Sequence, residues 1–132
     1  MLIVVVDKNS EEPVYGQIAR QIREMVADRR LQPGQSLPPV RLLASDLGIN
    51  LNTVARAYRL LEDEGFIRIR DRSGAEVTAP AASPAPETRD RLLEEFRALL
   101  ARLWQAGFPP AQLRQELELF EKQNDISRKE EI

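Results

Sequence analysis

Two short stretches of helical periodicity, separated by three residues, restrict the fold of this chain more than any other feature. The first predicts a helix over about residues 39–47, and Gly48 is a natural end for it because glycine tolerates left-handed backbone. The second predicts a helix over about residues 51–64, with Asn50 as its N-terminal cap and Gly65 as its end. Two short helices joined by a tight turn that contains glycine are typical of a helix-turn-helix.

A further helix and a β-hairpin are predicted on either side of this pair. Apolar residues recur at helical spacing over about residues 14–29, and Pro13 suits the start of such a helix. After the third helix, FIRIR alternates apolar and basic residues, DRSG can turn, and AEVTA can return as the partner strand. The opening LIVVV is interpreted as a short strand, because it lacks the length of a membrane span and the basic residues of a signal peptide. Residues 1–79 are therefore predicted to form one domain, a winged helix.

The rest of the chain has a different composition. PAASPAP begins a stiff, extended linker over residues 80–87, and helices are predicted over about 88–106 and 110–123, with a break at GFPP. The expected fold class is thus mainly α with a small β-hairpin, an N-terminal winged helix-turn-helix followed by a C-terminal two-helix dimerisation segment, 88–132, with a polar tail.

The two C-terminal helices carry apolar stripes too broad to be buried against each other alone. Pairing with the same segment of a second subunit is the simplest way to cover them. The alternative is that the helix pair packs back onto its own DNA-binding domain. The residues expected at the dimer interface are Leu92, Phe96, Leu99, Leu100, Leu103, Trp104, Leu113, Leu117 and Phe120.

The composition argues against an enzyme. The chain contains no cysteine and no histidine, which removes thiol nucleophiles, thiolate metal sites and the commonest proton shuttle. Carboxylates, lysine or tyrosine could still act as acids and bases, but no pair of them forms a recognisable catalytic motif. We expect no cofactor, no metal and no membrane contact, and the absence of cysteine fits a reducing, cytoplasmic location.

The third predicted helix has an outer face suited to reading DNA. At about 100° per residue, its core direction is set by four apolar and aromatic side chains, and Asn52, Arg56 and Arg59 point the opposite way. The four are Val54, Ala57, Tyr58 and Leu61. Arginine suits guanine edges and phosphates, and asparagine suits adenine edges, so Arg56 is expected to read a base and Arg59 to contact a phosphate. The alternative is an ordinary solvated surface. The formal net charge of −2 does not decide between them, because basic groups can cluster on one face.

Four motifs in order carry a family resemblance: P-x-Y-x-Q-I, L-x-P-G-x-x-L-P, L-A-x-x-L-G and N-T-V-x-R-A. Residues of about 11–78 resemble the winged-helix DNA-binding domain of the GntR family of bacterial transcriptional regulators. NTVARAYRLLE and the short helical tail resemble the YtrA-like subfamily in particular. That resemblance implies a dimeric repressor, often of operons encoding membrane transporters.

The same resemblance implies which residues contact DNA. The family's arginine at the start of the second helix falls on Arg41, and its wing on residues 71–75, DRSGA, where the family usually has R-x-G-x-G. Leu51 and Ala55 stand where the family commonly has arginine. With the outer face of the third helix, the expected DNA-binding residues are Arg41, Asn50, Asn52, Thr53, Arg56, Arg59, Arg72 and Gly74.

The sequence therefore predicts a sequence-specific DNA-binding transcription regulator. We expect a homodimeric repressor of an operon that binds a two-fold related operator in double-stranded DNA. The alternative hypothesis is a winged helix that contacts another protein and binds no specific DNA sequence. Steep salt dependence on duplex DNA would distinguish the two, because phosphate contacts release counterions.

Overall fold

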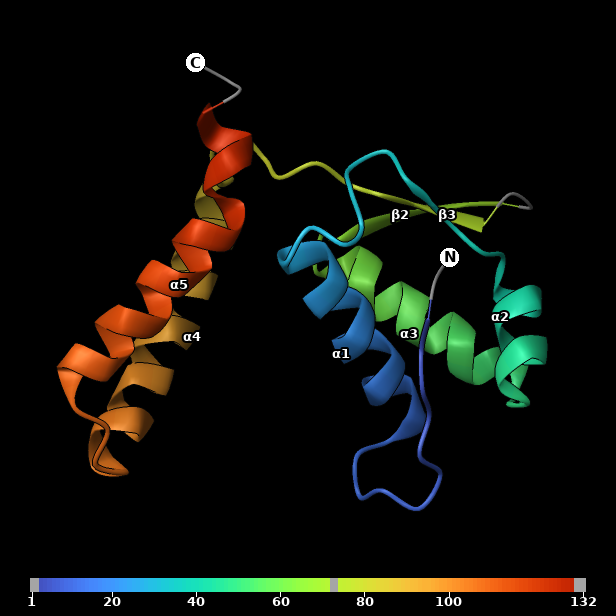
Figure 1. Cartoon of the computed structure of the whole chain (residues 1–132), viewed down its shortest axis with the longest axis horizontal. Helices are drawn as coiled ribbons and strands as arrows, with labels where there is room; N and C mark the ends of the chain where they lie inside the picture. Colours follow the sequence, from blue (N-terminus) through green and yellow to red (C-terminus); the bar gives the residue numbers. More distant parts are fainter. Residues whose placement is uncertain (1–2, 72–73, 130–132) are drawn as a thin grey trace. The chain divides into compact units, whose positions relative to one another are not determined.

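A computed structural model describes residues 3–71 and 74–129 of the chain, with side chains described as far as Asn124. The chain divides into two compact units, Met1–Pro80 and Ala81–Ile132. Within the described residues, the first unit holds helices α1 to α3 and a small antiparallel sheet, and the second holds α4 and α5 (Figure 1). The expected fold class, mainly α with a small β-hairpin, is confirmed.

The three helices of the first unit begin and end close to the predicted positions. They are α1 (Val14–Ala27), α2 (Val40–Leu47) and α3 (Leu51–Asp63). Gly48 ends α2 in the left-handed conformation, with φ 64° and ψ 39°. The Asn52 backbone N–H donates to Asn50 Oδ1 at 2.7 Å, which gives α3 its predicted cap. α1 ends two residues earlier than predicted, and Arg29 follows it with a φ of 69°.

The predicted hairpin is present and belongs to a three-stranded sheet. β2 (Ile67–Arg70) and β3 (Gly74–Val77) pair antiparallel, with Arg68 opposite Glu76. The outer edge of β3 pairs with β1 (Ser36–Leu37), so the strand order is β1-β3-β2. β1 was not predicted, because two residues between prolines show no periodicity.

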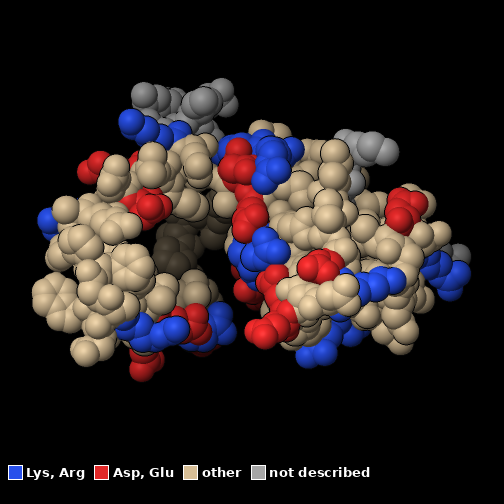
Figure 2. Space-filling view, turned by 60° about the horizontal axis from the view of Figure 1, so that its bottom comes forward, with Lys and Arg blue, Asp and Glu red and all other residues tan. Residues whose placement is uncertain are grey.

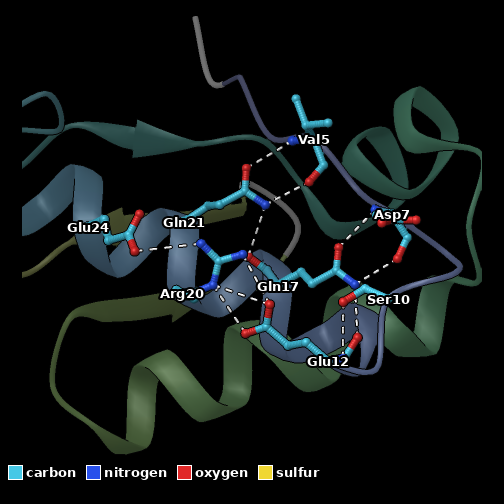
Figure 3. A network of polar contacts seen from close by, with 8 residues as sticks. All are labelled: Val5, Asp7, Ser10, Glu12, Gln17, Arg20, Gln21 and Glu24. Carbon is cyan, nitrogen blue, oxygen red and sulfur yellow. Dashed lines mark hydrogen bonds and ion pairs between the residues drawn. The ribbon is translucent and has the colours of Figure 1, made fainter.

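The start of the chain runs along α1, and the strand predicted there is wrong for the described residues 3–6. The Val5 N–H donates to Gln21 Oε1 at 3.0 Å, and Gln21 Nε2 donates to the Val5 carbonyl at 2.7 Å. Gln17 makes the same reciprocal pair with the Asp7 backbone, at 2.8 Å in both directions (Figure 3). The two glutamines are four residues apart on the helix, which is a rise of about 6 Å. Val5 and Asp7 are two residues apart in extended chain, which is about 6.6 Å, so the two spacings match. Two glutamines one turn apart therefore act in place of a partner strand.

The core of the first unit confirms the predicted inner face of α3. All four residues that set its core direction are buried, and α3 lies against α1, α2 and β2. Tyr58 is fully buried, and its hydroxyl donates to the Pro38 carbonyl at 2.7 Å. This hydrogen bond satisfies the phenol in the core and fixes the chain two residues before α2 begins.

The buried Tyr58 makes stability depend on alkaline pH. Burial raises the pKa of the Tyr58 phenol well above its usual value, whereas an unfolded tyrosine keeps a pKa of about 10. The unfolded state then releases its proton first, so the Tyr58 contribution is complete below about pH 10 and falls above it by at most about 1.4 kcal/mol per pH unit. Tyr58→Phe should remove this alkaline loss and cost about 0.5–1.5 kcal/mol at pH 7 through the lost hydrogen bond. Urea unfolding at pH 7, 10 and 11 tests this. Equal alkaline slopes in both proteins would contradict it.

The second unit is a helical hairpin of α4 (Pro86–Gln105) and α5 (Pro110–Lys129). α4 begins two residues earlier than predicted, because Pro86 occupies a first-turn position where its missing N–H costs nothing. α5 continues six residues beyond the predicted end at 123, because neither proline nor glycine interrupts that stretch. In the part of the chain that the structure describes, no helix has the length and apolar character needed to cross a bilayer.

Candidate DNA interface

The N-terminal half of α3 and the start of α2 present most of the residues predicted to contact DNA. Arg41, Asn52, Arg56 and Arg59 are all exposed, and Thr53 is half-buried. Asn50 is exposed too, but its side-chain oxygen already accepts the Asn52 N–H in the cap. Arg72 lies outside the described residues, so its place in the site stays a prediction.

A groove of about 680 Å³ joins two of these residues, Arg41 and Asn52, to the hairpin. It is bounded by the first turns of α2 and α3 and by the end of β2 with the start of β3. The lining residues are Pro39, Val40, Arg41, Leu51, Asn52, Ala55, Ile69, Arg70, Asp71 and Gly74. The structure therefore brings Arg41, Asn52 and Gly74 together, although they are far apart in the sequence. Thr53, Arg56 and Arg59 do not line this groove.

Gly74 has a packing role that the sequence did not show. It is buried, its φ is +92°, and a Cβ added there would lie 2.6 Å from the Leu37 carbonyl oxygen. The same Cβ would also lie 3.1 Å from the Pro39 nitrogen. Gly74 therefore lets the hairpin approach the backbone that leads into α2, and the shape of the groove depends on that approach.

Arg56 is held by an aromatic ring from another helix. Its Cζ lies 3.9 Å from the centroid of the Tyr15 ring, well inside the range of a cation–π contact. Tyr15 is the second residue of α1 and is half-buried. The sequence did not predict this contact, since the residues are 41 positions apart. The only available signal was the tyrosine of the P-x-Y motif, which reveals nothing about its partner.

The ion pairs of the first unit leave positive charge at the candidate interface. Glu12 and Glu24 pair with Arg20, Asp28 with Arg30, Glu64 with Arg23, and Glu76 with Arg70. A side-chain hydrogen bond from Arg30 also lowers the pKa of Asp28. By contrast, the arginines at the start of α2 and on α3, at positions 41, 56 and 59, form no ion pair with any acid in the described residues.

This positive charge is local. On the face shown in Figure 2, basic and acidic side chains are interspersed and do not form one large basic patch. Residues 1–79 hold 11 basic and 11 acidic side chains, so the first unit is formally neutral. Attraction to a polyanion must therefore come from local groups of arginines that form no ion pair, such as those on α2 and α3.

Comparison with known proteins gives one consistent family. Residues 14–77 match the family described as bacterial regulatory proteins, gntR family. The chain is 33% identical over 93 residues to the HTH-type transcriptional repressor YtrA of Bacillus subtilis, covering 70% of this chain and 72% of that protein. It is 41% identical over 73 residues to the HTH-type transcriptional regulator Rv1152 of Mycobacterium tuberculosis, covering 55% of this chain and 60% of that protein. The chain spans less than a fifth of some longer regulators that it also matches.

A solved structure agrees with this result. YtrA from Sulfolobus acidocaldarius, a GntR-family transcription factor, superposes with a TM-score of 0.59 at 40% identity. The superposition covers 76% of this chain and 99% of that one. These relatives carry the names of transcription regulators and not of enzymes, which supports the expectation of a non-enzymatic protein. With its winged-helix fold and these relatives, the chain belongs to the GntR family of bacterial regulatory proteins as a YtrA-like DNA-binding transcription regulator.

Proposed function

We propose that the protein is a homodimeric transcriptional repressor that binds a two-fold related operator. The observation that carries this proposal is the groove that joins Arg41, Asn52 and the start of β3 beside unpaired arginines of α3. The similar protein YtrA of Bacillus subtilis is named a repressor, which favours repression of an operon here too. Such a regulator acts in the cytoplasm, where bacterial DNA lies.

The start of α3 is the element that fits the major groove of DNA. Asn52 can accept from and donate to an adenine edge, and Ala55 is small enough to contact a thymine methyl. Arg41, at the first turn of α2, lies on the other side of the groove and is suited to a backbone phosphate. The hairpin tip, with Arg72 and Gly74, is assigned to the flanking minor groove or its phosphates.

The helical hairpin of the second unit supplies the dimer contact in this proposal. No residue of α4 is buried. Leu100, Leu103 and Leu113 are half-buried in the hairpin. The other six predicted interface residues are 46–67% exposed, namely Leu92, Phe96, Leu99, Trp104, Leu117 and Phe120. Each such side chain gains about 1.5–3 kcal/mol when it is covered, and a second copy would cover all six.

An apolar groove on this hairpin supports the same assignment. It has a volume of about 560 Å³ and is lined mainly by Phe96, Leu100, Leu103, Phe108, Leu113 and Leu117. Trp104, which is 67% exposed, does not line it. A two-fold axis would let exposed aromatic side chains of each copy enter the apolar groove of the other, which is the self-complementary contact that a symmetric dimer requires.

Operator binding by variants of the full chain tests the proposal. Selection of bound fragments from genomic DNA first defines the operator. Asn52→Ala should then weaken operator binding by about 1–3 kcal/mol and relax the preference at one base per half-site. Arg41→Ala should weaken binding to all DNA sequences alike. It should also lower the salt slope, which is the slope of log affinity against log salt concentration, by about one for each DNA-binding unit, or head. Fluorescence anisotropy with operator and scrambled duplexes at several salt concentrations measures both effects.

Arg30→Ala is the matched control, because it removes the same charge from an arginine already paired with Asp28. It should leave the operator affinity and the salt slope close to those of the unchanged protein. Selection that returns no preferred sequence, together with binding that does not depend on salt, would favour the alternative function as a protein-contacting winged helix and overturn the proposal.

A further inference from the structure

The contact between Tyr15 and Arg56 joins the first turn of α1 to the outer face of α3. The Arg56 Cζ lies over the Tyr15 ring, 3.9 Å from its centroid, which is well inside the range of a cation–π contact. A second contact of this kind in the described residues places Arg23 5.8 Å from the Phe66 centroid, but Arg23 is also paired with Glu64 at 2.6 Å. Arg56 is exposed and forms no such ion pair among the described residues.

The contact with Tyr15 leaves N–H donors of Arg56 available, because the side chain is exposed and forms no ion pair within the described residues. The five N–H donors of a guanidinium point outward from its edge, and one ring cannot cover all of them. The edge is therefore available for two oxygen atoms of a phosphate. The base-reading side of α3 lies along Leu51, Asn52 and Ala55, which line the groove that Arg56 does not line.

We propose that Tyr15 is a positioning residue for DNA binding, which holds Arg56 for contact with a backbone phosphate beside the bases read by α3. This inference rests on the proposed function, and it replaces the base contact that the sequence alone suggested for Arg56. An arginine side chain without the ring would sample many rotamers and would lose that freedom on binding. The ring restricts the rotamers of Arg56 in the free protein. Part of the side-chain entropy is therefore lost on folding, and less is lost on DNA binding.

Arg59 provides an internal comparison. It lies three residues after Arg56 on the same helix and is exposed. Within the described residues it stacks on no aromatic ring. Arg59 can contact DNA, but its contribution should not depend on residue 15. A pair of double-mutant cycles therefore separates positioning of Arg56 from any general effect of Tyr15 on the fold.

The experiment measures operator affinity of the full chain with substitutions at position 15. Tyr15→Phe keeps the ring and should bind within about two-fold of the unchanged protein. Tyr15→Ala and Tyr15→Leu remove the aromatic face and should weaken binding about two- to five-fold per head, or about 4- to 25-fold when two heads bind one operator. Tyr15→Leu keeps an apolar side chain of similar bulk, so it tests the aromatic face even where the alanine variant loses packing.

The double-mutant cycles then test whether the effect of residue 15 on operator affinity requires Arg56. In an Arg56→Ala background, Tyr15→Leu should have no further effect, whereas in an Arg59→Ala background it should retain its full effect. Equal effects in both backgrounds, or unchanged binding by Tyr15→Leu while Arg56→Ala weakens it, would overturn the inference and leave the proposed function standing. Failure of the unchanged protein to select any operator would overturn both.

A further readout is whether the loss of affinity depends on the DNA sequence. A phosphate contact predicts that Arg56→Ala and Tyr15→Leu weaken operator and scrambled duplexes by similar factors. It also predicts that Arg56→Ala lowers the salt slope by about one per head. A loss confined to one base position of the operator would assign Arg56 to a base edge and contradict the phosphate contact.

Discussion

Replacing Phe96 and Leu99 with glutamate in the full chain should give a folded monomer that has lost about 10²–10⁴-fold of its operator affinity. Both side chains are about half exposed on α4, at 53% and 46%, so their replacement should not disturb the contact between α4 and α5. Two charges at the centre of a dimer contact would have to be buried without partners, which prevents association.

The loss of affinity follows from the weakness of a single head. The first unit is formally neutral, because the arginines that form no ion pair are balanced by acids elsewhere on the same unit. Two linked heads make the second contact intramolecular, and that gain in avidity disappears with the dimer. The chain ending at Ala79 should behave in the same way, because the core of the first unit lies within that segment.

Analytical ultracentrifugation gives the mass of each variant, and anisotropy gives its operator affinity. The matched control is the pair Ala98→Glu and Gln105→Glu, which adds the same two charges at exposed positions on the polar side of α4. The control should remain dimeric and bind normally. If the Phe96 and Leu99 variant remained dimeric, the interface would lie elsewhere. Leu42, 52% exposed on α2 and outside the hydrophobic core of the first unit, would be the next position to substitute.

Gly74→Ala should destabilise the first unit by about 2–5 kcal/mol and weaken operator binding even at temperatures where the protein is folded. Its φ of +92° is unfavourable for alanine, and the added Cβ would lie 2.6 Å from the Leu37 carbonyl oxygen. The conformational cost is about 1–2 kcal/mol and the overpacking cost about 1–3 kcal/mol. Because the collision is with backbone, only a shift of the hairpin away from α2 can relieve it, and that shift would distort the groove.

Gly48→Ala is the control that separates the two costs. Gly48 also has a positive φ, 64°, but a Cβ there would meet no atom within 4 Å. This variant should lose only about 1–2 kcal/mol and should bind the operator normally once folded. Chemical denaturation measures the stability of each variant. Equal losses for the two variants would show that the hairpin tolerates the extra atom and that Gly74 does not shape the groove.

Much of the first unit follows from local features of the sequence. Gly48 and Asn50 fixed the end of α2 and the beginning of α3 as predicted, because caps depend on a few neighbouring residues. The buried side of α3 was predicted from spacing alone, because a period of about 3.6 residues requires Val54, Ala57 and Leu61 to share one face. The exposure of Asn52 and Arg59 follows from the same period.

The parts that were missed depend on residues distant in the chain. The start of the chain looked like a strand because apolar residues run together there, but its backbone bonds to Gln17 and Gln21 of α1. β1 exists only because the edge of β3 lies beside it. Neither partner is visible in the local pattern, since side-chain amides carry no periodic signal and a two-residue strand has no period.

The sequence by itself determined which segments are helical, where α2 ends and α3 begins, which face of α3 is buried, and which family the motifs resemble. The tertiary structure decided which of the exposed residues act together. It set Arg41 and Asn52 around one groove with Gly74, and it placed Tyr15 under Arg56, across 41 positions of the chain. The physical reason is the range of the interactions. Periodicity and capping are set within one or two helical turns, whereas stacking and close backbone approach depend on how distant segments pack in the folded core.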